Sequence, residues 1–353
     1  MLDLLPALRA RRIDVEMCVL GAGEAHLFTE NMQNAGVKTT VIPAGPDLNP
    51  ILIPKLVSQI RRFRPDLVHT HLIHADVHGQ LAARLAGKPA VSSMHSTVGN
   101  YRKLPYRWAA ARAGHSAKKT IAISGHVGRF LEELGIAPAE RIRVIPYGID
   151  AAQWNVTSPE RARIRGEFGV ETGVIAVGVA SRLFPGKGHD VLIDAFARSA
   201  DQFEGSTLLI AGDGSERSAL EGLSGAKACA GRVRFLGFVA DMRGFMNACD
   251  IFVFPSQPVF GEGFGLAALE AMAAGLPVIA TGIDSLPEIV VHEETGLLVS
   301  PADPDGLARA IVRLSSSDSF RKQLGAAARR RAMESFGLDL MVEKTIDVYR
   351  EAI

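Results

Sequence analysis

The 353-residue sequence is poor in aromatic residues and in cysteine, and it contains no long apolar run. Only 6% of its residues are aromatic while 47% are hydrophobic, so any core must be built mainly from aliphatic side chains and alanine. Three isolated cysteines, Cys18, Cys229 and Cys249, argue against a disulfide framework and favour a reducing compartment. No stretch has the ~18 apolar residues that a membrane span requires, and residues 1–12 do not resemble a secretion signal. We therefore expect a cytoplasmic protein.

Acidic residues are missing from one long stretch, since none lies between Asp76 and Glu132 although nine basic residues do. Residues 1–165 carry 22 basic and 13 acidic side chains, a net charge of +9, whereas the rest carries 17 and 25, a net charge of −8. The basic stretch is either a solvated face or a surface that attracts an anionic acceptor or lipid. Within it, basic and aromatic residues gather in segment 101–119, which we expect to contact an anionic membrane surface at the cytoplasmic face. The net charge of the whole chain is only +1, which argues against a nucleic-acid partner.

Short apolar runs alternate with helical patterns along the chain, which predicts parallel sheets covered by helices on both faces. Two groups of six runs predict an α/β protein of two doubly wound, Rossmann-like domains. We place the domains at 1–150 and 151–337 and expect the C-terminal helix 338–353 to pack back on the first. The predicted strands are 13–20, 37–43, 65–71, 89–95, 119–124 and 141–146, then 174–181, 206–212, 232–237, 250–256, 276–281 and 295–301.

The first domain begins with a helical pattern, "LDLLPALRARR", where a doubly wound sheet begins with a central strand and a glycine loop. The later "GAGEAH" at 21–26 follows the run 13–20, so it comes one strand too late to replace that loop. Two explanations stay open. Either the natural chain starts further upstream, or the sheet lacks its middle strand and has unpaired edges.

The stretch "FGEGFGLAALEAMAAGLPVIA", at 260–280, holds two carboxylates among glycine and apolar residues. A helix is predicted over about 265–274, because Gly275 and Pro277 end it. The residues at its start, 263–266, offer unpaired backbone N–H groups and the positive end of the helix dipole. They therefore predict an anion site.

The two carboxylates of this stretch lie on either side of that anion site. Glu270 is within the helix and its side chain leans towards the helix start, where it could accept hydrogen bonds from a ribose diol. Glu262 precedes the helix and could hold sugar hydroxyls or stabilise positive charge developing at a sugar carbon. The alternative is that Glu262 is merely exposed and Glu270 is salt-bridged in the core.

A second glycine-rich stretch, "GVASRLFPGKGHD" at 178–190, follows a predicted strand and leads into a helix. We expect Arg182 and Lys187 at the same end of the sheet as Glu262, where two cations would neutralise a diphosphate leaving group. The stretch is not a P-loop, because Gly188 stands where Ser or Thr should follow the Gly-Lys pair. A turn that merely carries two surface charges is the alternative.

The segment "VHTHLIHADVHG" contains four histidines, but no cysteine or carboxylate cluster accompanies them, which disfavours a metal site. His71 ends a predicted strand, so we expect it to line the ligand-binding edge. His95 ends the next strand, where it either reaches the ligand or is a histidine satisfied within the fold.

Taken in order, "SRLFPGKG", "LLIAGDG", "FLGFVADMRGFMNACDIFVFPS" and the Glu262-x7-Glu270 pattern resemble the large family of retaining glycosyltransferases with the GT-B fold, the glycosyl transferases group one. The resemblance covers 140–337. It implies two Rossmann-like domains that face each other across a cleft. It also implies transfer of a sugar from a nucleotide diphosphate sugar to a hydroxyl acceptor. The expected setting is the assembly of a polysaccharide, a lipopolysaccharide or a glycolipid.

The resemblance also implies roles for single residues. Glu270 would bind the nucleotide ribose, Glu262 the sugar, and Gly212 would lie near the base. His95 would approach the transferred sugar, so Glu262 and His95 are the candidate catalytic residues. The groups that would bind the donor diphosphate are Arg182, Lys187 and the backbone around Gly263, Phe264, Gly265 and Leu266.

No metal and no cofactor are implied, because the nucleotide sugar is a substrate; a lipid-linked acceptor fits the basic segment. Two other functions stay open, a non-catalytic nucleotide-sugar-binding protein or partner subunit, and a GT-B sugar-nucleotide epimerase.

Overall fold

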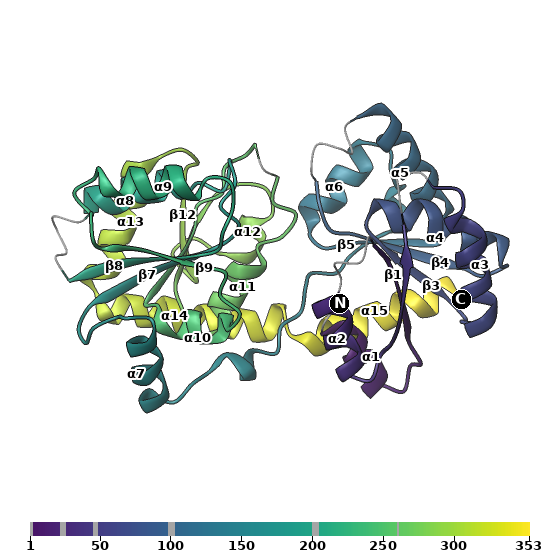
Figure 1. Cartoon of the computed structure of the whole chain (residues 1–353), viewed down its shortest axis with the longest axis horizontal. Coiled ribbons are helices and arrows are strands. Elements are labelled where there is room, and N and C mark those ends of the chain that lie inside the picture. Colours follow the sequence, from purple (N-terminus) through teal and green to yellow (C-terminus); the bar gives the residue numbers. More distant parts are fainter. Residues whose placement is uncertain (1–2, 22–25, 45–48, 98–102, 200–204, 260) are drawn as a thin grey trace. The chain divides into compact units, whose positions relative to one another are not determined.

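The structure is a computed structural model of the whole chain that describes residues 3–21, 26–44, 49–97, 103–199, 205–259 and 261–353. The chain forms two compact units (Figure 1). Unit 1 comprises Met1–Gly148 together with Leu338–Ile353, and unit 2 comprises Ile149–Gly337. The expectation of an α/β protein with two Rossmann-like domains and parallel sheets is confirmed.

Unit 2 contains one six-stranded parallel sheet in the order β12-β11-β10-β7-β8-β9. Its strands are aliphatic runs that are almost entirely buried, as expected where helices cover both faces of a sheet. The strands are β7 (Ile175–Ala180), β8 (Ser206–Ala211), β9 (Val233–Gly237), β10 (Ile251–Phe254), β11 (Val278–Thr281) and β12 (Gly296–Val299). The helices are α7 (Ser158–Glu167), α8 (His189–Ser199), α9 (Arg217–Gly225), α10 (Met242–Ala248), α11 (Leu266–Ala273), α12 (Leu286–Ile289), α13 (Pro304–Ser316) and α14 (Asp318–Ser335).

The helices of unit 2 form a layer on each face of its sheet. Helices α8, α9 and α13 lie on one face, and α10, α11 and α14 on the other (Figure 1). Strand side chains such as Val177, Leu208 and Ile251 pack against Phe196 of α8 and Ile311 of α13 in one continuous core. This packing fixes the position of the carboxyl ends of the strands, where the loops after β7 and β10 begin.

The strand order of unit 2 reverses between β7 and β10, because the chain builds β7, β8 and β9 outwards and then returns to the other side of β7. In doubly wound sheets, ligands bind beyond the carboxyl ends of the strands at such a switch point. The loops that leave this point are 181–188, after β7, and 255–265, after β10. They contain both glycine-rich stretches that the sequence singled out.

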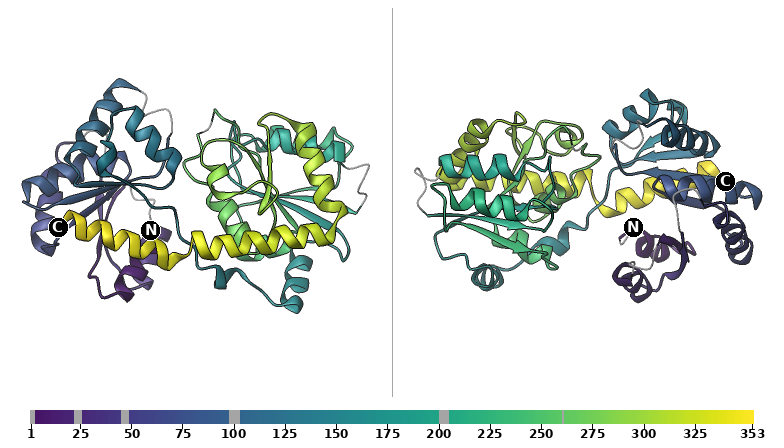
Figure 2. Two further views of the ribbon diagram at one scale, coloured as in Figure 1. Left: turned by 180° about the vertical axis from the view of Figure 1, so that it is seen from behind. Right: turned by 45° about the horizontal axis from the view of Figure 1, so that its top comes forward.

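Unit 1 holds six parallel strands in two separate sheets, a pair β1-β2 and a four-stranded sheet β3-β4-β5-β6. Its strands are β1 (Glu16–Gly21), β2 (Lys38–Pro43), β3 (Val68–His71), β4 (Ala90–Met94), β5 (Lys119–Ala122) and β6 (Ile142–Val144). Its helices are α1 (Leu4–Ala10), α2 (His26–Asn34), α3 (Leu52–Phe63), α4 (Ile73–Leu85), α5 (Leu104–Ser116), α6 (Gly125–Glu133) and α15 (Leu338–Ala352), the last seen along its length in Figure 2. Short 3-10 turns, η2 (Ala139–Arg141) and η3 (Ala151–Trp154), precede β6 and α7.

The two sheets of unit 1 share helices rather than backbone hydrogen bonds. Within the described residues, no hydrogen-bonded ladder joins β1 to β3, so the six strands form two sheets. A sheet without its middle strand was one of the two explanations drawn from the sequence. Successive residues of β4 face opposite sides of the sheet. Ala90 packs with Leu56 of α3 on one side, and Val91 packs with Val348 of α15 on the other. Most of the glycine stretch 21–26 lies outside the described residues.

Each of the twelve predicted runs coincides with one strand, usually shortened at its ends, although β1 extends one residue past the run 13–20. The shortening follows from pairing, because the terminal residues of a run leave the ladder to enter the adjoining loops. The stretch 147–163, which follows β6, contains η3 and the start of α7. Among the described residues, none of the helices combines the length and apolar character needed to cross a bilayer.

Candidate functional site

The two loops at the switch point of unit 2 are joined by a buried ion pair. Lys187 Nζ lies 2.5 Å from Glu262 Oε1, and only 10% and 8% of the two side chains are exposed. The hydroxyl of Ser256 donates to the same carboxylate oxygen at 2.6 Å. Glu262 Oε2 makes no hydrogen bond with any described residue, although it is not sealed from solvent. One oxygen is therefore held by the fold while the other is open to a ligand.

The backbone around Glu262 is fixed by residues that follow β11. The Glu262 N–H donates to Asp284 Oδ2 at 2.8 Å, and the Ser285 hydroxyl donates to the Glu262 carbonyl oxygen at 2.8 Å. Asp284 adopts a left-handed conformation with φ of 51°, which is uncommon for a residue other than glycine. Thr281 donates to the Ser256 carbonyl oxygen at 2.6 Å, so the loop after β10 rests on the one after β11.

Gly188 allows the loop after β7 to touch the loop after β10. It has φ of +74°, and a Cβ atom there would lie 2.0 Å from the carbonyl oxygen of Pro255. Beside it, the N–H of Gln257 donates to the Gly186 carbonyl oxygen at 2.8 Å. The glycine that rules out a P-loop therefore has a structural reason, since any side chain would separate the two loops that carry Lys187 and Glu262.

Helix α11 begins at Leu266, with Gly265 as its N-cap residue, so Gly263 and Phe264 precede the helix. Gly275 has φ of +80° and ends it as predicted. The exposure of the two glutamates is the reverse of the alternative drawn from sequence: Glu262 is only 6% exposed and Glu270 is half-buried.

Arg182 lies in the same loop as Lys187 but is exposed. Its guanidinium is 5.0 Å from the centroid of the Phe184 ring and forms no hydrogen bond or ion pair with the described residues. Gly212 lies against this loop, since a Cβ atom there would be 2.0 Å from the Ser181 carbonyl oxygen. The structure thus groups Arg182, Lys187, Gly212 and Glu262 around one edge of the sheet, with Gly263–Leu266 and α11 continuing from it.

The histidines predicted in unit 1 form a stacked, hydrogen-bonded cluster at the carboxyl ends of β3 and β4. His71 Nδ1 lies 2.8 Å from His95 Nε2, and His95 Nδ1 lies 2.6 Å from the Tyr147 hydroxyl oxygen. His69 Nδ1 lies 2.7 Å from the Tyr349 hydroxyl oxygen, and its Nε2 lies 2.8 Å from Ser93 Oγ. His95 thus has partners within the fold at both ring nitrogens.

Burial favours the neutral form of all three rings. Loss of solvent, reinforced by the neighbouring histidine, lowers the pKa of His69 to about 3. Burial lowers the pKa of His95 to about 4, and it holds the pKa of His71 well below the ordinary value. These imidazoles are therefore uncharged near pH 7 and can exchange hydrogen bonds with hydroxyl groups.

A buried carboxylate of α4 lies against the opposite face of β3. Asp76 Oδ1 accepts hydrogen bonds from Thr70 at 2.5 Å and from Ser92 at 2.8 Å, and Gln80 donates to the Thr70 hydroxyl at 2.8 Å. Burial raises the pKa of Asp76 to about 7, although both hydroxyl donors oppose the shift. This network connects α4 to β3 and β4. It thereby holds in place the two strands that carry the histidine cluster.

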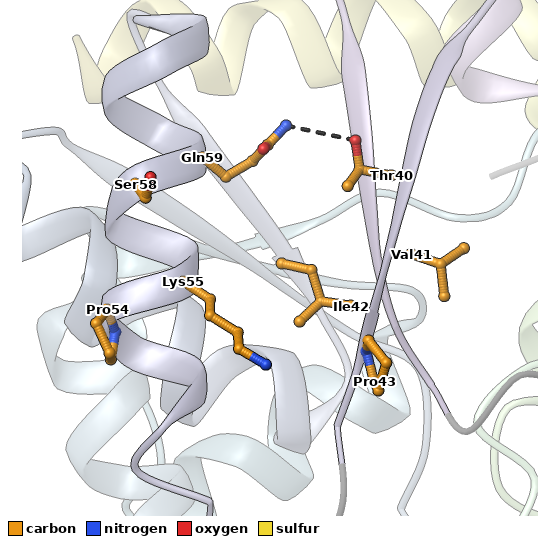
Figure 3. Close-up of a pocket in the computed structure, with 8 residues that line it drawn as sticks. All are labelled: Thr40, Val41, Ile42, Pro43, Pro54, Lys55, Ser58 and Gln59. Carbon is orange, nitrogen blue, oxygen red and sulfur yellow. Dashed lines mark hydrogen bonds between the residues drawn. The ribbon is translucent and has the colours of Figure 1, made fainter.

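No group of three or more His, Cys, Asp or Glu side chains in the described residues is arranged to hold a metal ion. A hollow of about 520 Å³ lies elsewhere in unit 1, between β2 and α3. Figure 3 shows the side chains that line it. The residues that line it are Thr40, Val41, Ile42, Pro43, Pro54, Lys55, Ser58 and Gln59. None of the predicted site residues is among them, and Lys55 is the only charged one, so the hollow adds no reactive group.

Sequence reasoning missed Ser256, Asp284 and Ser285, which hold Glu262. The signal was present, because Ser256 follows β10 and "GIDS" at 282–285 follows β11. The rule that drew attention to the residues after β7 and β10 applies equally to those after β11. It also missed Tyr147 and Tyr349, for which no local pattern exists.

The sequence of this chain matches two known protein families. "Glycosyl transferases group 1" matches residues 160–331, and "Glycosyltransferase Family 4" matches residues 1–153. A glycogen synthase from Mycobacterium tuberculosis is 30% identical over 305 residues, which cover 83% of this chain and 70% of that protein. The chain belongs to the glycosyl transferases group 1 family.

Other relatives of this glycosyltransferase act on different substrates. The GDP-mannose-dependent alpha-(1-6)-phosphatidylinositol monomannoside mannosyltransferase of M. tuberculosis is 30% identical over 76% of this chain and 71% of that protein. The crystal structure of HepE from Anabaena with UDP-glucose is 26% identical, with a TM-score of 0.86 over 99% of this chain and 94% of that one. The fold and the enzyme class predicted from the sequence resemblance are thereby confirmed.

Proposed function

We propose that this glycosyltransferase binds a nucleotide diphosphate sugar at the switch point of unit 2 and transfers the sugar, with retained configuration, to a hydroxyl acceptor. The relatives' names support this class of donor, since one uses GDP-mannose and the structure of HepE contains UDP-glucose. Those two nucleotides differ in their base, so the relatives do not indicate which base the donor of this enzyme carries. Polysaccharide, lipopolysaccharide or glycolipid assembly is the proposed setting.

The observation that carries the proposal is the carboxylate of Glu262, of which only one oxygen is hydrogen-bonded by described residues. Its Oε1 is held by Lys187 and Ser256, while Oε2 is open among the described residues. A buried carboxylate with one fixed and one open oxygen is positioned to accept hydrogen bonds from sugar hydroxyls. It also stabilises positive charge that develops at the sugar carbon in the transition state.

The remaining groups suit the diphosphate and the nucleoside. The exposed guanidinium of Arg182 has no hydrogen bond or ion pair among the described residues and can bind phosphate oxygens. Lys187 supplies a second cation at a fixed position. Backbone amides from Gly263 to Leu266 lie at the start of α11, where the helix dipole favours an anion. Glu270, four residues into the helix, is placed to accept from ribose hydroxyls. Gly212 packs directly against the Ser181 backbone, so that the loop after β8 lies beside the loop of Arg182, where we place the base.

The proposed transfer needs no metal ion and no cofactor. The bond between the sugar carbon and the diphosphate oxygen breaks while the acceptor oxygen attacks from the same face. The acceptor proton passes to the departing phosphate oxygen, and Arg182, Lys187 and the helix-end amides stabilise the negative charge. Retention follows because the attack and the departure use one face of the sugar.

The test is a donor screen with UDP-glucose, GDP-mannose and ADP-glucose. We expect one donor to release its nucleotide and to give a transferred sugar of unchanged anomeric configuration, read by proton NMR of the product. Tight binding of a donor without any release would contradict the proposal and indicate a nucleotide-sugar-binding protein or partner subunit. A changed sugar still joined to its nucleotide would indicate an epimerase.

We also propose that α5 contacts an anionic membrane on which a lipid-linked acceptor resides. Trp108 is 72% exposed, and Lys103, Arg107 and Arg112 are exposed around it. An exposed indole among basic side chains is the composition of an interfacial surface. Of the proposed segment, residues 101–102 lie outside the described part of the chain.

Sedimentation with phosphatidylglycerol vesicles tests the membrane contact. We expect binding to anionic vesicles that weakens with salt and in Arg112→Glu, but not in Arg330→Glu, an exposed arginine of unit 2. Equal binding to phosphatidylcholine and phosphatidylglycerol vesicles would remove the electrostatic basis of this proposal.

A further inference from the structure

The loop after β7 holds an aromatic side chain next to one of its two cations. The guanidinium carbon of Arg182 lies over the Phe184 ring, 5.0 Å from the ring centroid. Arg182 is exposed, and Phe184 is itself 38% exposed although it is a large apolar side chain. At this distance the electron-rich face of the ring attracts the cation. The contact therefore restrains an arginine that lies at the surface.

The residue between these two side chains fixes the backbone that carries them. Leu183 is fully buried, its N–H donates to the Asp213 carbonyl oxygen at 2.9 Å, and its carbonyl oxygen accepts from the Glu216 N–H at 3.0 Å. Because Leu183 points into the core, its two neighbours, Arg182 and Phe184, are left outside on the same side of the loop. The loop after β8 thus holds the backbone from which the ring projects.

The two cations of the loop differ in the charge that faces them. Lys187 is paired with the buried carboxylate of Glu262, which compensates its charge. Arg182 forms no ion pair or hydrogen bond with the described residues, so its charge is not compensated there. An aromatic ring holds a cation without neutralising it, whereas a carboxylate would do both. Arg182 is therefore restrained and still able to bind an anion with its full charge.

We propose that Phe184 positions the Arg182 guanidinium for the diphosphate of the donor. This inference rests on the proposed donor site and adds a positioning residue to it. An arginine side chain has many rotamers, and fixing it when a ligand binds costs affinity. A ring that already restrains the guanidinium reduces this cost. Phe184 thus acts through Arg182 and needs no contact of its own with the nucleotide.

Calorimetry with the nucleotide that wild type binds most tightly among UDP, GDP and ADP tests the assignment. Phe184→Leu keeps an apolar side chain but removes the aromatic face, and we expect it to raise Kd about two- to fivefold, the effect of a cation–π contact at an exposed site. Phe184→Tyr keeps the ring and should bind like wild type. In an Arg182→Gln background, Phe184→Leu should have no further effect, because the contact is already lost.

The dependence of Kd on salt concentration separates position from charge. It should become weaker in Arg182→Gln, which removes a charge, and stay unchanged in Phe184→Leu, which does not. Phe320→Leu is the matched control, because the Arg313 guanidinium lies 4.6 Å from the centroid of the Phe320 ring between α13 and α14, outside the donor loops. We expect this control to leave Kd for the nucleotide unchanged.

Proton NMR of the Arg182 side chain gives a readout that needs no ligand. An aromatic ring shifts the resonances of protons above its face, so Phe184→Leu should move the Arg182 δ-proton signals and Phe184→Tyr should leave them near their wild-type positions.

The inference and the proposed function fail in different ways. An equal rise of Kd in the wild-type and Arg182→Gln backgrounds would show that Phe184 contacts the nucleotide itself, and would overturn the positioning role alone. Movement of the Arg182 signals in Phe184→Leu without any change in Kd would also overturn it alone. Failure of wild type to bind UDP, GDP and ADP would overturn the proposed function, and the inference with it.

Discussion

Replacing Glu262 by glutamine is expected to lower sugar transfer by about a hundredfold or more while leaving the affinity for the nucleotide diphosphate nearly unchanged. The amide keeps the volume of the side chain and can still accept from Ser256, but it removes the negative charge at the open oxygen. Loss of one preorganised group that stabilises transition-state charge has effects of this order. Nucleotide release and calorimetric binding of UDP or GDP measure the two quantities.

The stability of related variants separates the chemical role of Glu262 from its structural one. Glu262→Ala leaves the Lys187 ammonium buried without its carboxylate, and breaking a buried pair costs about 3–5 kcal/mol. Replacing both partners, as Lys187→Met with Glu262→Gln, should recover most of that stability but no activity. Glu294→Gln, at an exposed position of the same unit, is the control. Transfer at wild-type rates in Glu262→Gln would show that this carboxylate has no part in the reaction.

Gly188→Ala is expected to separate the two loops of the donor site and to abolish transfer. The new methyl group would lie 2.0 Å from the Pro255 carbonyl oxygen, and backbone on both sides would have to move. That movement breaks the hydrogen bond between Gln257 and Gly186 and displaces Lys187 from Glu262. Thermal unfolding and nucleotide release measure the change.

Gly173→Ala is the matched control for Gly188→Ala. Gly173 has φ of +85°, close to the +74° of Gly188, but a Cβ atom there meets no other atom within 4 Å. Both variants should therefore lose about 1–2 kcal/mol for the left-handed backbone, and only Gly188→Ala should lose a further ~1–3 kcal/mol by overpacking. Equal stability and activity of the two variants would mean that the close contact at Gly188 is relieved without consequence.

The strands were predictable because runs such as "VIAVGVAS" carry their own signal of burial on both faces. Their pairing partners were predictable only in part. The missing central strand indicated a gap in the first sheet, but nothing in the runs 13–20 and 65–71 places that gap between β1 and β3. The course of the chain after β10 was predictable for a different reason, as Gly275 and Pro277 mark where α11 must stop. Local chemistry therefore determined the elements, while the sheet boundary in unit 1 depended on contacts distant in sequence.

The site was predictable where its residues share one loop or one motif. Lys187 and Glu262 were expected at the same edge because both follow strands at a switch point, and the structure joins them. Asp284 was not expected as a support of Glu262, because 22 residues separate the two and only the fold brings them together. For His95, position was accessible from sequence but hydrogen-bonding state was not, since its partners Tyr147 and His71 are distant in the chain.

The noncontiguous make-up of unit 1 has a consequence for how the chain emerges from the ribosome. Val342 and Ile346 complete the core around Leu4 and Leu8, although all of unit 2 separates these residues in the sequence. All of Ile149–Gly337 is available before α15 is synthesised, so unit 2 can reach its native packing first. The core around Leu4 and Leu8 is therefore completed only after the whole of unit 2 has been synthesised.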